Sequence, residues 1–178
     1  YGMGNHEYRL GLYPDQYPGM YEGYMKGLKS AGIEPLVNER TYLPAWNVDV
    51  CGVQIDRQYY KHFHNKPMEI SYLEKLLGAS REDAFQVLIA HNPVYFETYA
   101  GWGADLVVAG HVHGGIMRLP VFGGVVSPSL TLFPKYDGGR FENGKSTMIL
   151  SRGLGSHTLP LRIFNPGELV VLNLAPDK

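Results

Sequence analysis

Two histidines lie two residues apart in the stretch 109–115, which reads Ala-Gly-His-Val-His-Gly-Gly. The apolar residues 106–109 come just before them and predict a buried strand that ends in a glycine-rich turn. Neutral imidazole is a good ligand for Zn, Fe, Mn or Ni. Because alternate residues of an extended chain point the same way, His111 and His113 either share one metal or divide between two neighbouring metals. The alternative is a glycine-rich turn that carries two surface histidines.

A third histidine ends another apolar run. Residues 85–90 read as a strand buried on both faces, and His91 follows them in the sequence Ala-His-Asn-Pro. Pro93 cannot continue a central ladder, so the strand must stop there. Two successive buried strands therefore each deliver a histidine at the carboxyl end, which is harder to attribute to chance than either histidine alone.

A further polar group stands at residues 4–7, where Gly-Asn-His-Glu follows what reads as the end of a strand. Loops at strand ends are where α/β sheets keep their chemistry. The alternatives are an Asx-turn at Asn5, a loop histidine at His6 and a helix-start charge at Glu7.

Two other places carry histidines. His62 and His64 belong to the aromatic and basic stretch 59–66, which reads as a solvated loop that could line a substrate cleft and supply positive charge to an anion. His157 is a lone loop histidine.

Three of these segments together resemble the last three signature blocks of the calcineurin-like metallophosphoesterases. They are Gly-Asn-His-Glu at 4–7, Ala-His-Asn-Pro at 90–93 and Gly-His-Val-His at 110–113. The last two look most like the bacterial branch of the family, whose members are often attached to the membrane by an N-terminal segment. The resemblance covers residues 4–115 and extends more loosely to the end of the chain.

The resemblance implies a role for each matching residue. Asn5, His91 and His111 would ligate one metal and His113 the other, while His6 would protonate the leaving oxygen or stabilise charge on it. Two divalent transition metals (Mn, Fe or Zn) would bind phosphoryl oxygens and lower the pKa of a bridging water, and the resulting hydroxide would attack phosphorus in line. Glu7 would orient His6.

The sequence departs from the family pattern in one large respect. The Asp-x-His and Gly-Asp blocks with which the family begins are not in this chain. We therefore expect residues 1–178 to be the C-terminal portion of a single metallophosphoesterase domain, a layered α-β-β-α sandwich of mixed sheets whose N-terminal part is missing. Such a portion would hold at most one metal well and would be nearly inactive alone. The full-length protein would hydrolyse a phosphodiester or a pyrophosphate.

Two other functions remain as alternatives. One is a metallophosphoesterase-like scaffold that has lost catalysis and binds a protein partner, although a scaffold has no use for a proton donor such as His6. The other is a mononuclear zinc module, for which three histidines and an amide would be unusual ligands.

Composition limits the class of partner. The chain of 178 residues has 16 basic and 17 acidic residues and a net charge of -1, so a general attraction to nucleic acid or anionic membrane is not indicated. We expect a small phosphorylated substrate, lipid- or nucleotide-linked. The single cysteine, Cys51, excludes an intrachain disulfide and reads as a buried core residue. We expect a cytoplasmic location or attachment to the cell membrane through an upstream segment.

The same patterns predict the elements that position these residues. The aromatic residues 95, 96, 99 and 102 either flank a cleft or pack a helix onto the sheet. The helix at 21–31 should cover a sheet, and Asn143-Gly144 indicates a hairpin. A second helix is expected at 70–77, and further strands at 33–37, 42–43, 48–55 and 169–174.

Overall fold

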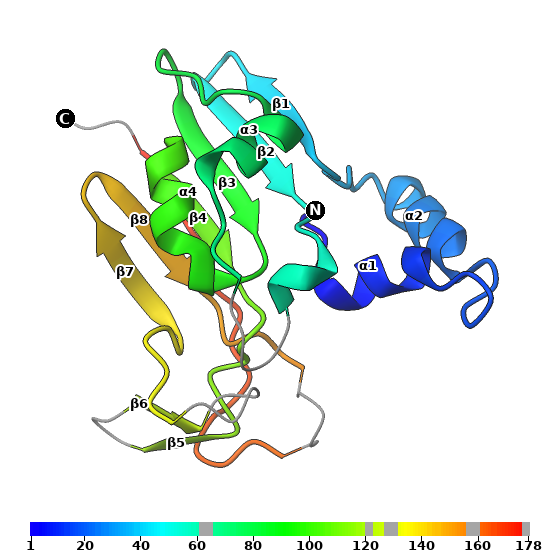
Figure 1. Cartoon of the computed structure of the whole chain (residues 1–178), viewed down its shortest axis with the longest axis vertical. Coiled ribbons are helices and arrows are strands. Elements are labelled where there is room, and N and C mark those ends of the chain that lie inside the picture. The colour runs from blue at the N-terminus through cyan, green and yellow to red at the C-terminus, as the bar shows by residue number, and fades with distance from the viewer. Residues whose placement is uncertain (61–65, 120–122, 127–131, 156–160, 176–178) are drawn as a thin grey trace.

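The computed structural model describes residues 1–60, 66–119, 123–126, 132–155 and 161–175. Their strands form a six-stranded mixed sheet in the order β1-β2-β3-β4-β8-β7 and a two-stranded sheet of β5 and β6, with helices flanking them (Figure 1). The expected α/β class and mixed sheets are confirmed. The strands are β1 (Glu39–Leu43), β2 (Val48–Val53), β3 (Phe85–Ala90), β4 (Leu106–Ala109), β5 (Met117–Leu119), β6 (Gly123–Val126), β7 (Gly139–Asn143) and β8 (Ser146–Leu150).

The centre of the large sheet is parallel. β2, β3, β4 and β8 run in one direction, whereas β1 and β7 are antiparallel strands at the two edges. The carboxyl ends of the four parallel strands therefore meet at one edge of the sheet. The segments that follow them, beginning at residues 54, 91, 110 and 151, are brought together there although they lie far apart in the sequence.

Two helices cover one face of this sheet. α3 (Ile70–Leu77) and α4 (Phe96–Trp102) lie in front of β2, β3 and β4 in Figure 1. Their buried side chains pack on alternate residues of the parallel strands, because alternate residues of a strand share a face. Phe96, Tyr99 and Trp102 are at most 4% exposed. The predicted packing role of these aromatics is thus confirmed, and they do not flank a cleft.

The N-terminal helices lie elsewhere. α1 (Asn5–Leu12) and α2 (Met20–Ser30) stand beside the sheet and contact each other, at the right of Figure 1. The helix expected at 21–31 therefore forms, but none of its residues is buried and it covers no sheet. Its apolar stripe faces α1 and the start of the chain, where Tyr24 donates a hydrogen bond to the Tyr1 hydroxyl.

The remaining elements were predicted with mixed success. The helix at 70–77, the strands at 85–90 and 106–109, and the hairpin between β7 and β8 are confirmed. The strand expected at 48–55 is present but ends at residue 53, and the strand expected at 42–43 is the end of β1. The strand expected at 33–37 is wrong, since it reduces to one bridge between Gly2 and Leu36. The strand expected at 169–174 is also wrong, because no described strand pairs with it and its side chains are exposed. In the described part of the chain, no helix is long and apolar enough to cross a membrane.

Candidate metal centre

The ends of β3 and β4 bring two of the predicted ligands together. Val87, Leu88 and Ile89 of β3 pair with residues 106–108 of β4, so both strands stop at the same level of the sheet. The backbone N–H of Gly110 then donates to the carbonyl oxygen of His91 at 3.1 Å. The imidazole rings of His91 and His111 lie edge to face with centroids 5.2 Å apart. The predicted meeting of these two histidines is therefore present in the structure.

The first turn of α1 brings Asn5 to the same place. The Asn5 Oδ1 atom lies 3.1 Å from Nε2 of His91. Gly4 is buried against this imidazole, and a Cβ there would stand 3.3 Å from Cε1 of His91. Residues 4–7 are thus the start of a helix rather than a loop. The Glu7 carboxylate accepts from the Gly4 N–H at 3.1 Å, which is the helix-start role.

The environment of His91 keeps its ring in the form that binds metals. Burial, followed by the nearby charges of His113 and His6, lowers the pKa of His91 to about 4. The imidazole is therefore neutral at physiological pH, with a nitrogen lone pair available. The influence of His113 and His6 on this pKa also shows that both side chains belong to the surroundings of His91. The His6 side chain is exposed to solvent.

The turn that carries His111 and His113 is not extended. Both residues have left-handed backbone angles, with φ of 72° and 50°, and the chain bends sharply through them. The expectation for residues two apart assumed an extended chain, and the backbone here is not extended. The His111 ring lies against the His91 ring. The His113 ring lies near Gly155, since a Cβ on Gly155 would be 3.6 Å from Cε1 of His113. His113 thus lies next to Gly155 as well as in the surroundings of His91.

Tyr60 is a residue of the site that the sequence did not single out. Its ring centroid is 5.1 Å from that of His111 and 6.3 Å from that of His91. It ends the short helix η1 (Arg57–Tyr60), which is held in place because Asn92 donates to the Tyr59 carbonyl at 2.9 Å. The sequence feature that could have indicated Tyr60 is its position at the start of the aromatic and basic stretch 59–66.

Three histidines of the sequence analysis, His62, His64 and His157, lie outside the described residues. The structure therefore relates none of them to the site.

The side chains of Asn5, His91 and His111 could supply some, but not all, of the ligands of a divalent cation. Two imidazoles and an amide oxygen are ligands that first-row metals accept. Among the described residues, however, no group of three or more His, Cys, Asp or Glu is gathered as a metal site. Asn5, His91 and His111 are thus suited to contribute to a site whose remaining ligands, in particular carboxylates, these residues do not supply.

The described residues thus combine a mixed α/β fold with histidines that follow the carboxyl ends of parallel strands. The chain is similar to several curated bacterial proteins. It is 30% identical over 101 residues to an uncharacterized metallophosphoesterase of Bacillus subtilis, covering 57% of this chain and 35% of that protein. It is 28% identical over 179 residues to an uncharacterized metallophosphoesterase of Helicobacter pylori, covering 99% of this chain and 42% of that protein.

A third relative has a more specific name. The chain is 28% identical over 172 residues to the phosphodiesterase YaeI of Escherichia coli, covering 97% of this chain and 56% of that protein. The chain thus spans between 35% and 56% of the length of these three relatives. No family model and no solved structure matches the chain. The similarities support the metallophosphoesterase family.

Proposed function

We propose that this chain belongs to a metal-dependent phosphoester hydrolase of the calcineurin-like metallophosphoesterase family. The observation that carries the proposal is the meeting of Asn5, His91 and His111 at the carboxyl edge of the sheet. These three residues come from three separate segments, and each falls in one of the motifs that the sequence shares with the family. The relatives named metallophosphoesterase and phosphodiesterase point to the same chemistry.

The residues would divide the work as follows. Asn5, His91 and His111 would hold one divalent cation through neutral donors, and His113 would contribute to a second. When bound, such cations neutralise phosphoryl oxygens and acidify water, so that no nucleophilic side chain is required. His6 is exposed at the start of α1, where its imidazole can reach a bound substrate and protonate the leaving oxygen.

The proposed substrate is a small phosphodiester or pyrophosphate, lipid- or nucleotide-linked. Tyr60 supports this choice, since its ring lies against both His91 and His111 and offers an apolar surface beside the reacting group. The near-zero net charge of -1 means that an anionic substrate must be held locally rather than by the overall field of the protein. Membrane association would come from a segment outside this chain.

The test uses the full-length protein with Mn²⁺ and bis(p-nitrophenyl) phosphate, and compares two variants. We expect His91→Ala to lose Mn²⁺ affinity by more than the ~10 to 100-fold typical of outer-shell changes, because it removes a ligand. His6→Asn should keep its metal and lose about 10² to 10⁴-fold in kcat. An active wild-type protein with two metals per chain supports the proposal, and residues 1–178 alone should be nearly inactive.

Other metal contents would favour the alternatives. A full-length protein with no bound metal and no turnover would indicate the binding scaffold. One tightly bound zinc without turnover would indicate the mononuclear module. Equal turnover by residues 1–178 and the full-length protein would contradict the division of the site between this chain and a missing part.

A further inference from the structure

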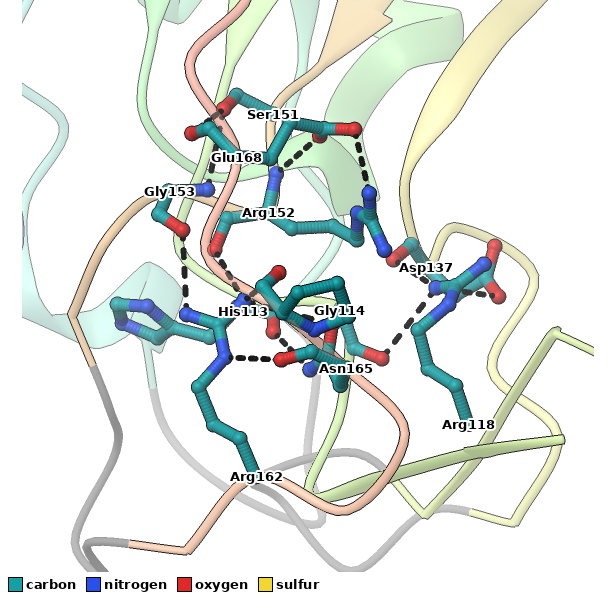
Figure 2. Close-up of polar contacts among 11 residues, drawn as sticks. His113, Gly114, Arg118, Asp137, Ser151, Arg152, Gly153, Arg162, Asn165 and Glu168 are labelled. Carbon is teal, nitrogen blue, oxygen red and sulfur yellow. Dashed lines mark hydrogen bonds and ion pairs between the residues drawn. The ribbon is translucent and has the colours of Figure 1, made fainter.

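A buried asparagine outside the histidine motifs lies directly under the paired-histidine turn. Asn165 is 2% exposed, and its side-chain amide donates to the backbone carbonyls of His113 and Gly115, each at 2.7 Å (Figure 2). Its separation from these residues is 52 and 50 positions. A single side chain therefore connects the C-terminal segment to both sides of Gly114.

The turn needs these hydrogen bonds because of its backbone. His113, Gly114 and Gly115 have φ of 50°, 72° and 84°, which is a run of three residues in the left-handed region. A non-glycine residue such as His113 is strained in this conformation, which persists only where its surroundings hold it. The Asn165 amide donates one N–H to the carbonyl on each side of Gly114 and so fixes the backbone of the turn at two points.

Arg162 fixes the same segment from the other side. Its guanidinium donates to the carbonyls of Gly153 at 3.1 Å, Arg152 at 3.3 Å and Asn165 at 2.7 Å (Figure 2). It also donates to the Gly155 carbonyl. Gly155 is the residue whose Cβ position lies 3.6 Å from the His113 ring. Arg162 thus holds both Asn165 and the loop against which His113 rests.

We infer that Asn165 is a positioning residue for the metal-binding turn. By tying down the carbonyls of His113 and Gly115 it sets the direction of the His113 imidazole, and Arg162 keeps Asn165 and the 152–155 loop in register with it. The inference rests on the proposed function, since it assigns Asn165 to the cation that His113 serves. None of the three histidine motifs contains Asn165 or Arg162.

Asn165→Asp is the decisive variant in the full-length protein. It keeps the shape of the side chain but replaces the two N–H donors by an oxygen that faces two carbonyl oxygens. We expect affinity for the weaker of two bound Mn²⁺ ions to fall about 10 to 100-fold, as for other groups that orient a ligand. Electron paramagnetic resonance counts free and bound Mn²⁺ in a titration of metal-depleted protein, independently of activity. The loss of kcat at low Mn²⁺ should be rescued by excess Mn²⁺.

Ser146→Ala is the matched control. Ser146 is also buried and donates to a backbone carbonyl, that of Ala104 at 2.6 Å, but it lies at the opposite end of β8 from the site. It should lower thermal stability without changing Mn²⁺ affinity. Should Asn165→Asp fail to fold, Arg162→Lys, which keeps the charge and loses the fork of donors, should give the same Mn²⁺ defect.

The outcomes separate this inference from the proposed function. Weakened Mn²⁺ binding in Asn165→Asp or Arg162→Lys, with none in Ser146→Ala, supports it. Unchanged affinity in folded variants, or an equal loss in Ser146→Ala, overturns the inference while leaving the hydrolase in place. A wild-type protein that neither binds Mn²⁺ nor hydrolyses phosphoesters overturns the proposed function, and the inference with it.

Discussion

Replacing Gly114 by alanine should damage the paired-histidine turn by two separable effects. The φ of Gly114 is +72°, which costs an alanine about 1–2 kcal/mol. A Cβ there would also stand 2.7 Å from Oδ1 of Asn165 and 2.8 Å from Cγ and Cδ of Arg152. Neither neighbour can give way easily, because Asn165 is held by two hydrogen bonds and Arg152 is paired with Glu168 at 2.8 Å. Overpacking of this kind costs about 1–3 kcal/mol more.

Gly144→Ala isolates the first effect. Gly144 has φ of +59° in the hairpin between β7 and β8, and nothing lies within 4 Å of a Cβ at that position. It should lose only the conformational ~1–2 kcal/mol. Denaturant unfolding of both metal-depleted variants should therefore differ by about 1–3 kcal/mol, with Gly114→Ala the less stable. Equal losses would refute the packing of Asn165 and Arg152 over the turn.

Two further predictions concern the sheet beneath the site. Cys51 is fully buried, and burial, assisted by the Asp49 carboxylate, raises the pKa of its thiol to about 12. A disulfide reagent at mildly alkaline pH should therefore react with Cys51 only as the protein unfolds. Fast labelling of the native protein would contradict this prediction. Arg40→Leu should destabilise the protein by about 3–5 kcal/mol in thermal or denaturant unfolding, because it leaves Asp49, 1% exposed, without its cation. In the wild type, burial raises the pKa of Asp49, but hydrogen bonds from Arg40 and Gln86 outweigh burial, so the pKa lies below 3.8. The ionised Asp49 carboxylate therefore stabilises the folded protein above pH 3.8, and this contribution is lost as pH falls. In Arg40→Leu the effect of burial on Asp49 prevails, so the pKa of Asp49 is raised instead of lowered. The stability of this variant should therefore decrease as pH rises through that pKa, and a pH profile like that of the wild type would contradict the prediction.

Much of the central sheet could be predicted because its signals are local. β4 is an apolar run and β3 is one apart from Gln86, and Gly110 and Pro93 follow them, so the approximate bounds and the burial follow from composition. The helix α3 begins and ends where its apolar spacing and Gly78 indicate. Strands that carry their own turn signal, such as the hairpin at Gly144, are equally accessible.

The errors lie where a partner decides the structure. Residues 169–174 have the apolar content of a strand, yet strand formation requires a neighbour to accept the ladder, and no described strand pairs with them. α2 is amphipathic, but its pattern specifies an apolar stripe and not the surface that this stripe meets. The helix α1 was not predicted, because the residues of Gly-Asn-His-Glu that favour a turn are equally common at the start of a helix.

The candidate site shows the same division between local and long-range signals. Parallel pairing of β3 with β4 places His91 beside His111, and this follows from two strand predictions alone. The orientation of His113 does not, because it depends on a left-handed turn held by a side chain 52 residues away. Asn165 begins an Asn-Pro-Gly sequence, which by itself indicates only a turn. A sequence motif therefore identifies the side chains able to bind a metal. The residues that orient those side chains, such as Asn165, come from segments that are distant in the sequence and contact the motif only in the folded chain.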